Sequence, residues 1–261
     1  MTMRMQRYVP ICILAAFMLL AGCLPSGDVP EPRLSDDALI FSQAQKALDA
    51  HDYPDAARLL QIFLREFPRS KRYTWALQRM GEAMQGLLAS YYLRPIERGQ
   101  DEPGARAAFL ASYGSYGCWT AAGGRLNYDG SHYHRLLADY PDCNIADEAA
   151  YRLVLLSADP EGRPENIKQE LGYFEEVLER YPTSSFRYEI FYDMAYRCHR
   201  LYELYSYSNR PGESDPKQAQ LYREKAVYLY SLALKSPRHG LFAEKAWKNL
   251  RDLEDGRRVF P

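Results

Sequence analysis

Three stretches of helically spaced apolar residues end on the same short motif, in which a leucine is followed three residues later by an aromatic residue and then by proline. The aromatic-proline pairs are Phe67-Pro68, Tyr140-Pro141 and Tyr181-Pro182. Because proline lacks a backbone N–H and its ring clashes with the preceding turn, each pair marks the end of a helix. A new helical pattern begins within a few residues of each ending, so the sequence predicts a series of antiparallel helix pairs.

The stretch before the first ending shows the pattern clearly, because its apolar residues recur at steps of three and four and therefore form one stripe. They are Ala56, Leu59, Leu60, Phe63, Leu64 and Phe67. Further helices are expected over residues 73–88, 145–157, 186–205 and 241–253. The last of them follows a degenerate ending at Pro237, and the spacing between endings is irregular, which predicts an interrupted repeat rather than a regular array.

A long insertion interrupts the pattern at about residues 94–130. Pro95, Pro103 and the six glycines that precede Gly130 break any long helix there, apart from a short helical piece over residues 105–110. Two interpretations stay open: an irregular linker between two helical halves, or a partner-facing loop of the kind that repeat proteins place on a binding face. A second loop ends in Asp215-Pro216, which caps and begins a helix expected over residues 217–235.

The N-terminus has the features of an export signal. Arg4 and Arg7 precede an apolar run over residues 9–21, which is shorter than the roughly 20 residues that a membrane-spanning helix needs. The following Leu20-Ala21-Gly22-Cys23 resembles the lipobox of bacterial lipoproteins. This resemblance implies that residues 1–22 are removed as a signal peptide and that Cys23 then carries a covalent lipid, with acyl chains such as palmitate.

No cofactor other than this lipid is expected. The alternative to a lipoprotein is a soluble exported protein in which a cysteine stands at position 23 by coincidence. Leu24 follows the cysteine where an aspartate would be expected for inner-membrane retention, so the resemblance favours the outer membrane. Residues 23–35 are rich in proline, glycine and acidic side chains and predict an extended tether between the lipid and the folded domain.

The body of the chain resembles tetratricopeptide repeats. Residues 52–56, with Leu60, Phe63 and Pro68, match the second helix of such a repeat, and residues 75–83 and 146–153 resemble first helices. The resemblance implies an all-α, tetratricopeptide-like solenoid of antiparallel helix pairs over residues 36–261, with the long irregular insertion at about 94–130 inside it.

Lipobox, tether and repeats together resemble the outer-membrane β-barrel assembly lipoproteins. This resemblance implies a non-catalytic scaffold on the periplasmic face of the outer membrane, which binds other envelope proteins or extended peptide segments and takes part in outer-membrane protein assembly. The alternative within the same class is a scaffold lipoprotein of another cell-envelope machine, such as a pilus, secretion or cell-wall complex.

Two other classes of function are disfavoured. Lys and Arg total 33 against 34 Asp and Glu, so the chain lacks the positive charge of a nucleic-acid-binding protein. His132, His134 and Cys118 could serve a periplasmic hydrolase, which is the least favoured alternative. Two histidines that are two positions apart on a helix point in different directions, so no metal site and no enzyme are expected.

Tyrosine is abundant, with 22 residues, and Tyr188, Tyr192 and Tyr196 recur every four positions. This spacing places them in one row on one helix. The row has two interpretations. It can pack between neighbouring helices of the repeat, or, together with Tyr202 and Tyr205, it can line a groove that holds an extended peptide or a partner helix.

Three cysteines besides Cys12 and Cys23 remain in the chain: Cys118, Cys143 and Cys198. An oxidising compartment favours a disulfide between two of them. Cys118 and Cys143 are the candidate pair, because a bridge between them would pin the end of the insertion to a helix terminus. Cys198 would then be a buried thiol, although the sequence alone leaves the pairing open.

Overall fold

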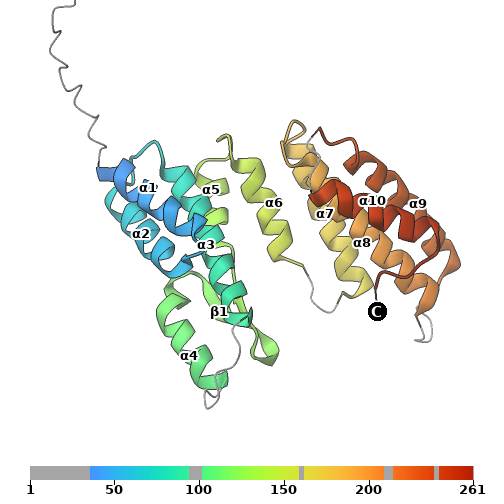
Figure 1. The fold of residues 1–261 in the computed structure, drawn as a ribbon, viewed down its shortest axis with the longest axis horizontal. Helices are drawn as coiled ribbons and strands as arrows, with labels where there is room; N and C mark the ends of the chain where they lie inside the picture. The colour runs from blue at the N-terminus through green and yellow to red at the C-terminus, as the bar shows by residue number, and fades with distance from the viewer. Residues whose placement is uncertain (1–35, 94–101, 159–161, 209–213, 238–240, 261) are drawn as a thin grey trace, which may run out of the picture. The chain divides into compact units, whose positions relative to one another are not determined.

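The computed structural model describes residues 36–93, 102–158, 162–208, 214–237 and 241–260. The predicted fold is confirmed, since the described chain is an all-α series of antiparallel helix pairs (Figure 1). The helices are α1 (Asp36–Asp49), α2 (Tyr53–Glu66), α3 (Tyr73–Leu93), α4 (Glu102–Tyr113), α5 (Ser131–Asp139), α6 (Ala146–Leu156), α7 (Pro164–Arg180), α8 (Arg187–Tyr207), α9 (Pro216–Ala233) and α10 (Leu241–Glu254).

Each helix except α4 packs on the next helix of the series, and α5 takes the position next to α3. The helix pattern expected from the sequence agrees with α3, α6, α8 and α10 to within a few residues. The predicted cap at Asp215 is also confirmed, because its carboxylate accepts the N–H groups of Lys217 and Gln218 at 2.9 and 3.1 Å. Local sequence signals therefore determine where most of the helices begin and end.

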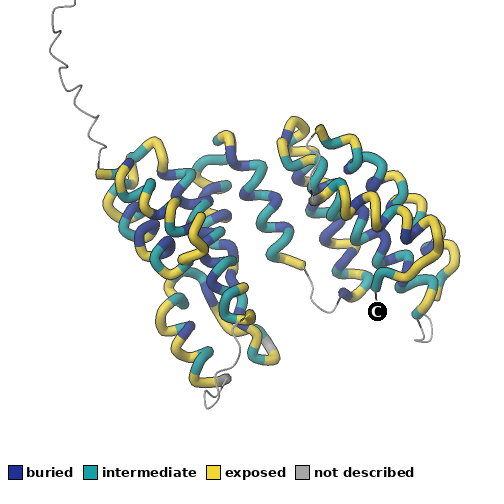
Figure 2. The backbone as a smooth tube through the Cα atoms, in the orientation of Figure 1, coloured by how far each residue is buried: buried dark blue, intermediate teal, exposed yellow. Residues whose placement is uncertain are grey.

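Two apolar cores hold the helices together, and buried positions run along the inner faces of the helices in Figure 2. The first core joins α1, α2, α3 and α5 to the start of α6, and the second joins the rest of α6 to α7–α10. α6 belongs to both, with Ala146 and Ala149 in the first core and Tyr151 and Val154 in the second. The stripe predicted in α2 is buried at Ala56, Leu59, Leu60 and Phe63.

Two of the aromatic-proline endings carry a serine whose hydroxyl ties the turn to the preceding repeat helix. We call this arrangement the serine clasp. The hydroxyl donates to an aspartate at the second residue of an earlier helix and accepts the N–H two residues further along the turn. The distances are 2.6 Å for Ser70 to Asp37, 2.7 Å for Ser184 to Asp147, and 3.1 Å for each N–H, from Arg72 and Phe186.

The remaining ending lacks the clasp on both sides. Cys143 takes the place of the serine, and Thr74 takes the place of the aspartate as the second residue of α3. The backbone turn itself is kept, since Cys143 N–H donates to the Tyr140 carbonyl at 3.1 Å as the two serines do to Phe67 and Tyr181. The clasp is thus an addition to a turn that forms without it.

Two glycines in α3 let the neighbouring helices approach closely. A Cβ atom at Gly81 would lie 2.3 Å from the ring of Tyr133 in α5, and one at Gly86 would lie 2.2 Å from the ring of Tyr53 in α2. Such distances are far inside van der Waals contact, so these positions accept no larger side chain without movement of the tyrosines. Glycine in α3 therefore creates the space into which each tyrosine packs.

The insertion is more regular than the sequence analysis predicted. In place of a short helical piece it contains the twelve-residue helix α4 and an antiparallel hairpin of β1 (Cys118–Thr120) and β2 (Leu126–Tyr128), with two short 3₁₀ turns, Gly114–Tyr116 and Ala122–Gly124. The prediction failed because Pro103 is in the first turn of α4, where proline favours a helix instead of breaking it.

The compact unit begins at Asp36. The predicted signal peptide, residues 1–22, and tether, residues 23–35, lie outside the described residues, as does the lipidated Cys23. Among the helices that the structure describes, none combines the length and apolar character required to cross a bilayer.

Candidate functional site: an apolar groove beside the insertion

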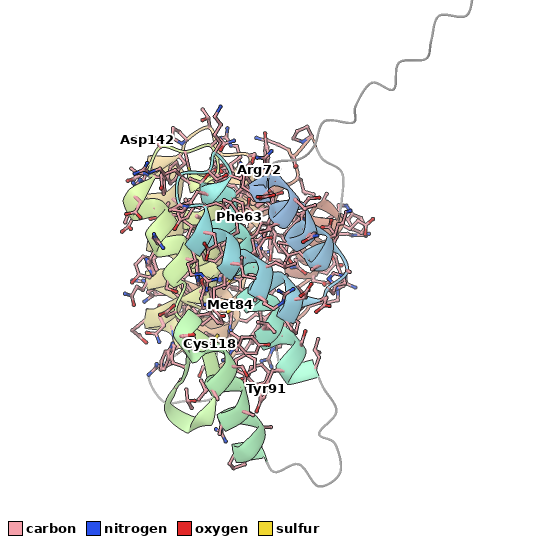
Figure 3. The ribbon with its side chains drawn as sticks, turned by 90° about the vertical axis from the view of Figure 1, so that its left-hand side faces the viewer. Phe63, Arg72, Met84, Tyr91, Cys118 and Asp142 are labelled. Atoms are coloured by element: carbon pink, nitrogen blue, oxygen red, sulfur yellow. The ribbon has the colours of Figure 1, made fainter. Side chains whose placement is uncertain are left out.

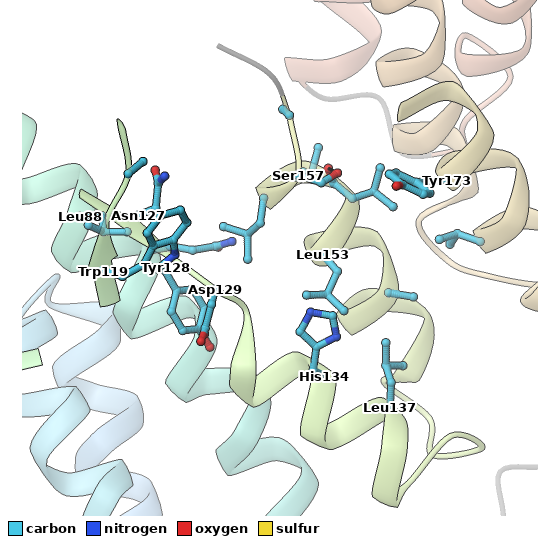
Figure 4. Close-up of a pocket in the computed structure, with 18 of the residues that line it drawn as sticks. Leu88, Trp119, Asn127, Tyr128, Asp129, His134, Leu137, Leu153, Ser157 and Tyr173 are labelled. Carbon is cyan, nitrogen blue, oxygen red and sulfur yellow. Dashed lines mark hydrogen bonds between the residues drawn. The ribbon is translucent and has the colours of Figure 1, made fainter. Parts of the chain in front are cut away.

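A groove of 1110 Å³ lies where α3, the hairpin, α5, α6 and α7 face one another (Figure 4). We call it the interaction groove. Apolar side chains from these elements form most of its lining. They include Leu88, Leu126, Leu137, Leu153, Val154, Leu156 and Val177. Aromatic side chains and a charged rim complete it, a composition typical of surfaces that bind other molecules.

One tyrosine hydroxyl holds the hairpin to the end of α3. The Tyr92 hydroxyl donates to the carbonyl of Leu126 at 3.1 Å and accepts the N–H of the same residue at 2.7 Å. Because both backbone groups of Leu126 point away from β1, a single side chain satisfies this edge of the hairpin. The contact positions the hairpin, and with it Trp119, along the groove wall.

Large aromatic surface is exposed along this wall. Trp119 is 49% exposed and Tyr92 is 50% exposed, although side chains of this size are usually covered. Both line the interaction groove, as do Tyr173 and Tyr181 from α7 and its end. Exposed aromatic rings beside an apolar floor are the typical anchors of protein interfaces.

Charged residues border the apolar floor. They are Arg125 and Asp129 near the hairpin, and Glu176 and Arg180 on α7. The rim therefore offers both signs of charge, which suits the polar backbone and mixed side chains of a peptide better than a ligand of a single charge.

His132 has a structural role. Its Nδ1 lies 2.8 Å from the Tyr128 hydroxyl, which also accepts the backbone N–H of His132 at 3.2 Å. Burial lowers the pKa of His132 to about 4, so the ring is neutral at pH 7. His134 instead points into the interaction groove, as Figure 4 shows, so the two histidines do not converge on one site. The described residues contain no group of three or more His, Cys, Asp and Glu side chains arranged to hold a metal ion.

Among the residues that the structure describes, Cys118, Cys143 and Cys198 are free thiols, so the structure does not contain the predicted Cys118–Cys143 disulfide. Cys118 is buried with its Sγ 4.0 Å from the Met84 Sδ, and burial raises the pKa of its thiol to about 11. Figure 3 shows Cys118 and Asp142, the neighbour of Cys143, at opposite ends of the α3–α5 layer. The helix α5 separates them, and that is why the thiols do not meet. Cys198 is buried within α8.

The predicted row of Tyr188, Tyr192 and Tyr196 does not line the interaction groove, and its ring contacts are with α8, α9, α10 and the segment after α10. Tyr192 and Tyr196 stack at 6.3 Å, and Tyr192 also meets Phe242 of α10 at 5.7 Å. Tyr196 meets Phe260 edge-on at 4.8 Å. These contacts fit the alternative in which the row packs between neighbouring elements.

The other predicted tyrosines have similar intramolecular partners. Tyr205 stacks on Tyr222 of α9 at 5.9 Å, and the Tyr202 and Tyr207 hydroxyls are 3.3 Å apart. Tyr188 meets Phe191 at 6.4 Å. A partner-binding role for Tyr188, Tyr192, Tyr196, Tyr202 and Tyr205 stays a prediction.

The sequence did not identify the interaction groove as a site, and His134, one of its lining residues, was considered only for a hydrolase. An apolar lining drawn from five elements has no motif, and its side chains resemble those of any amphipathic helix. The one available signal was Trp119, an aromatic residue within a glycine-rich insertion, where no helical stripe required it.

Comparison with known proteins gives little further information. No protein-family model matches the chain, and no curated protein matches it. Among solved structures, a tetratricopeptide repeat protein from Parabacteroides merdae is 14% identical, with 84% of this chain and 98% of that chain covered and a TM-score of 0.18. A similarity of this size carries no functional conclusion, and the fold assignment rests on the helix pairs themselves.

Proposed function

We propose that the protein is a non-catalytic, lipid-anchored scaffold that binds other envelope proteins through the interaction groove. The observation that carries the proposal is an open apolar groove of 1110 Å³ with half-exposed Trp119 and Tyr92 on its wall. Such a surface stays in water only at a free-energy penalty, which a bound partner removes.

A protein segment suits this groove better than a small metabolite. The groove runs across five elements, whereas a small-molecule site usually encloses its ligand and contains a few convergent polar groups. Its apolar floor and mixed charged rim can accept an extended or helical segment in several residue contacts.

The anchor supports a place at the cell envelope. Cys23, in its lipobox, would carry the lipid, and residues 23–35 would hold the repeats away from the bilayer toward the periplasm. The outer membrane is the proposed location, and outer-membrane protein assembly the proposed process, because lipobox, tether and repeats together resemble lipoproteins of that system. A scaffold for a pilus, secretion or cell-wall complex is the second candidate.

In-cell photo-crosslinking tests the groove. A photoreactive residue at Trp119 should crosslink to subunits of the β-barrel assembly machinery, whereas the same residue at Tyr228, which is 63% exposed on α9 outside the groove, should not. Crosslinks to pilus or secretion proteins would favour the second candidate. Equal crosslinking at both positions, or none at Trp119, would refute the role of the groove.

Truncation of the anchor aromatic tests the energetics. Trp119→Ala should weaken partner capture about tenfold or more, as expected for an interface anchor, while the matched Tyr228→Ala should have little effect. Since both side chains are exposed, neither substitution should change the melting temperature by more than a degree or two.

Metabolic labelling with a palmitate analogue tests the anchor separately. Label should appear in the wild type, be absent from Cys23→Ala, and coincide with membrane association. An unlabelled wild type would refute the lipid anchor while leaving the groove proposal intact.

A further inference from the structure

The segment that follows α10 turns back onto α8 (Figure 1). We call residues 257–260 the tail segment. Gly256 has φ +67°, a left-handed conformation that lets the chain reverse after the helix. Arg257 Nε then lies 3.0 Å from Asp252 Oδ1. The tail segment therefore has a defined path that starts at an ion pair with the end of α10.

Glu203 of α8 receives the backbone of the tail segment. Glu203 is 3% exposed, and its two carboxylate oxygens accept two consecutive N–H groups, from Val259 at 2.6 Å and from Phe260 at 3.0 Å. This pairing is charge-assisted and uses both oxygens of one carboxylate. Glu203 thus binds the backbone of an extended segment, and these two hydrogen bonds do not depend on the side chain of either residue.

The ring of Phe260 lies among side chains of the same face of α8. It meets Tyr196 edge-on at 4.8 Å and His199 edge-on at 5.8 Å, and the Arg200 guanidinium lies over it at 5.8 Å. We call Tyr196, His199, Arg200 and Glu203 the α8 cradle. It combines an aromatic slot with backbone acceptors, the two elements by which extended peptides are bound.

The chemistry of the cradle is unusual for packing alone. A buried carboxylate is normally paired with a cation, and an apolar residue would fill the same space at lower free-energy cost. His199 Nε2 is 3.3 Å from Glu203 Oε1, but burial lowers the pKa of His199 to about 4, so the ring is neutral at pH 7. Two N–H groups of an extended chain are therefore the hydrogen-bond donors that the structure shows on the Glu203 carboxylate.

We propose that the α8 cradle is a binding site for an extended segment of a partner protein, one that carries a basic residue followed two or three positions later by an aromatic side chain. The tail segment occupies this site in cis and is displaced when the partner binds. The tail segment itself defines this chemistry, because Arg257 pairs with Asp252, Arg258 lies over the Tyr207 ring at 5.0 Å, and Phe260 fills the slot.

Acidic Asp252 and Glu203 complement a basic segment, and the cradle shares no residue with the interaction groove. The proposal rests on the function proposed above, since a scaffold is what would use a second peptide site. Competition by the tail segment would also set the apparent affinity of the cradle for a partner. A tethered competitor is present at an effective concentration in the millimolar range, so a free peptide binds in proportion to the fraction of empty cradles.

A fluorescence anisotropy experiment on the full-length chain tests the proposal. The opened variant carries Val259→Pro, which removes an N–H donor, and Phe260→Ala, which removes the ring. The probe is a labelled peptide of residues 256–260, Gly-Arg-Arg-Val-Phe, with blocked ends. We expect the probe to bind the opened variant at least about tenfold more tightly than the wild type, because the cis competitor is weakened.

Two controls make the result specific. A control peptide with proline for valine and alanine for phenylalanine should not bind. Glu203→Gln in the opened variant should lower the affinity for the probe about tenfold or more, with an unchanged circular dichroism spectrum, because the charged acceptor is lost. The single variant Phe260→Ala serves as the opened protein if the double variant unfolds.

The proposal is overturned if the probe binds the folded opened variant no better than the wild type, or if the control peptide binds equally well. The failure would be separate from that of the proposed function. Retained crosslinking at Trp119 in the opened variant, without probe binding, would refute the cradle and leave the groove in place.

Discussion

Removal of a serine clasp gives a direct measure of how the repeats are joined. In Ser184→Ala the Asp147 carboxylate loses a hydroxyl donor at 2.7 Å, and the Phe186 N–H loses its acceptor at 3.1 Å. Ser184 is only 5% exposed, so water replaces these partners poorly. A hydrogen bond to a charged group contributes about 1.5–3 kcal/mol, and we expect Ser184→Ala to lower the free energy of unfolding by about 2 kcal/mol.

The chain supplies its own controls. Ser70 makes the corresponding hydrogen bond to Asp37 but is only half-buried, and the Arg72 guanidinium also lies 3.5 Å from the Asp37 carboxylate. We therefore expect Ser70→Ala to lower the free energy of unfolding by only about 1 kcal/mol. Cys143→Ala changes the corresponding position of the ending that has no clasp, and should lose no more than about 0.5 kcal/mol. For a domain of this length, about 2 kcal/mol corresponds to a melting temperature lower by roughly 4–8 °C.

Urea unfolding followed by circular dichroism would rank the variants. The double variant Ser184→Ala, Asp147→Asn should be less destabilised than the sum of its two single variants, because both changes remove one interaction. The reasoning would be refuted if Ser184→Ala lost no more stability than Cys143→Ala, or if the double variant were fully additive.

Three further predictions use other parts of the structure. Gly81→Ala places a Cβ 2.3 Å from the Tyr133 ring and should destabilise the protein by about 1–3 kcal/mol. Gly172→Ala in α7, where the added Cβ would meet open space, should instead stabilise the protein by about 0.5–1 kcal/mol. Equal effects of the two variants in thermal unfolding would refute the packing argument. Burial lowers the pKa of His199 to about 4 from 6.5, so the unfolded chain binds more protons between these values, and the free energy of unfolding should fall as the pH drops from 6.5 toward 4. That slope should be shallower in His199→Gln, and an unchanged slope would contradict a buried neutral ring. Thiol titration of the lipidated protein, denatured without reductant, should find three free thiols, and a single thiol would restore the predicted bridge.

The helices were predictable because their signals are local. Apolar steps of three and four, proline endings and the Asp215 cap each act within a few residues, and the structure keeps them. The failure at α4 was also local, since Pro103 and Gly104 read as helix breakers although both are in its first turn. Only the position of a proline relative to a helix start decides its effect.

The contacts that join repeats were not predictable, because their partners are distant in sequence. The clasp partners are 33 and 37 residues apart, and Tyr92 binds a hairpin residue 34 positions later. A serine or tyrosine alone gives no hint of such a partner. The interaction groove has the same origin, because its lining comes together only when the insertion packs back onto α3 and the repeats.

The shared position of α6 has a mechanical consequence. Because Ala149 packs in the first core and Val154 in the second, a load applied to one core reaches the other through α6, and Tyr181, which packs against both cores, is a further connection. With the proposed tether before α1 and the α8 cradle in the second core, pulling by a bound partner would load this junction between the two cores. The resistance of the protein to traction would then depend on the eleven residues of α6 together with Tyr181, and on neither core alone.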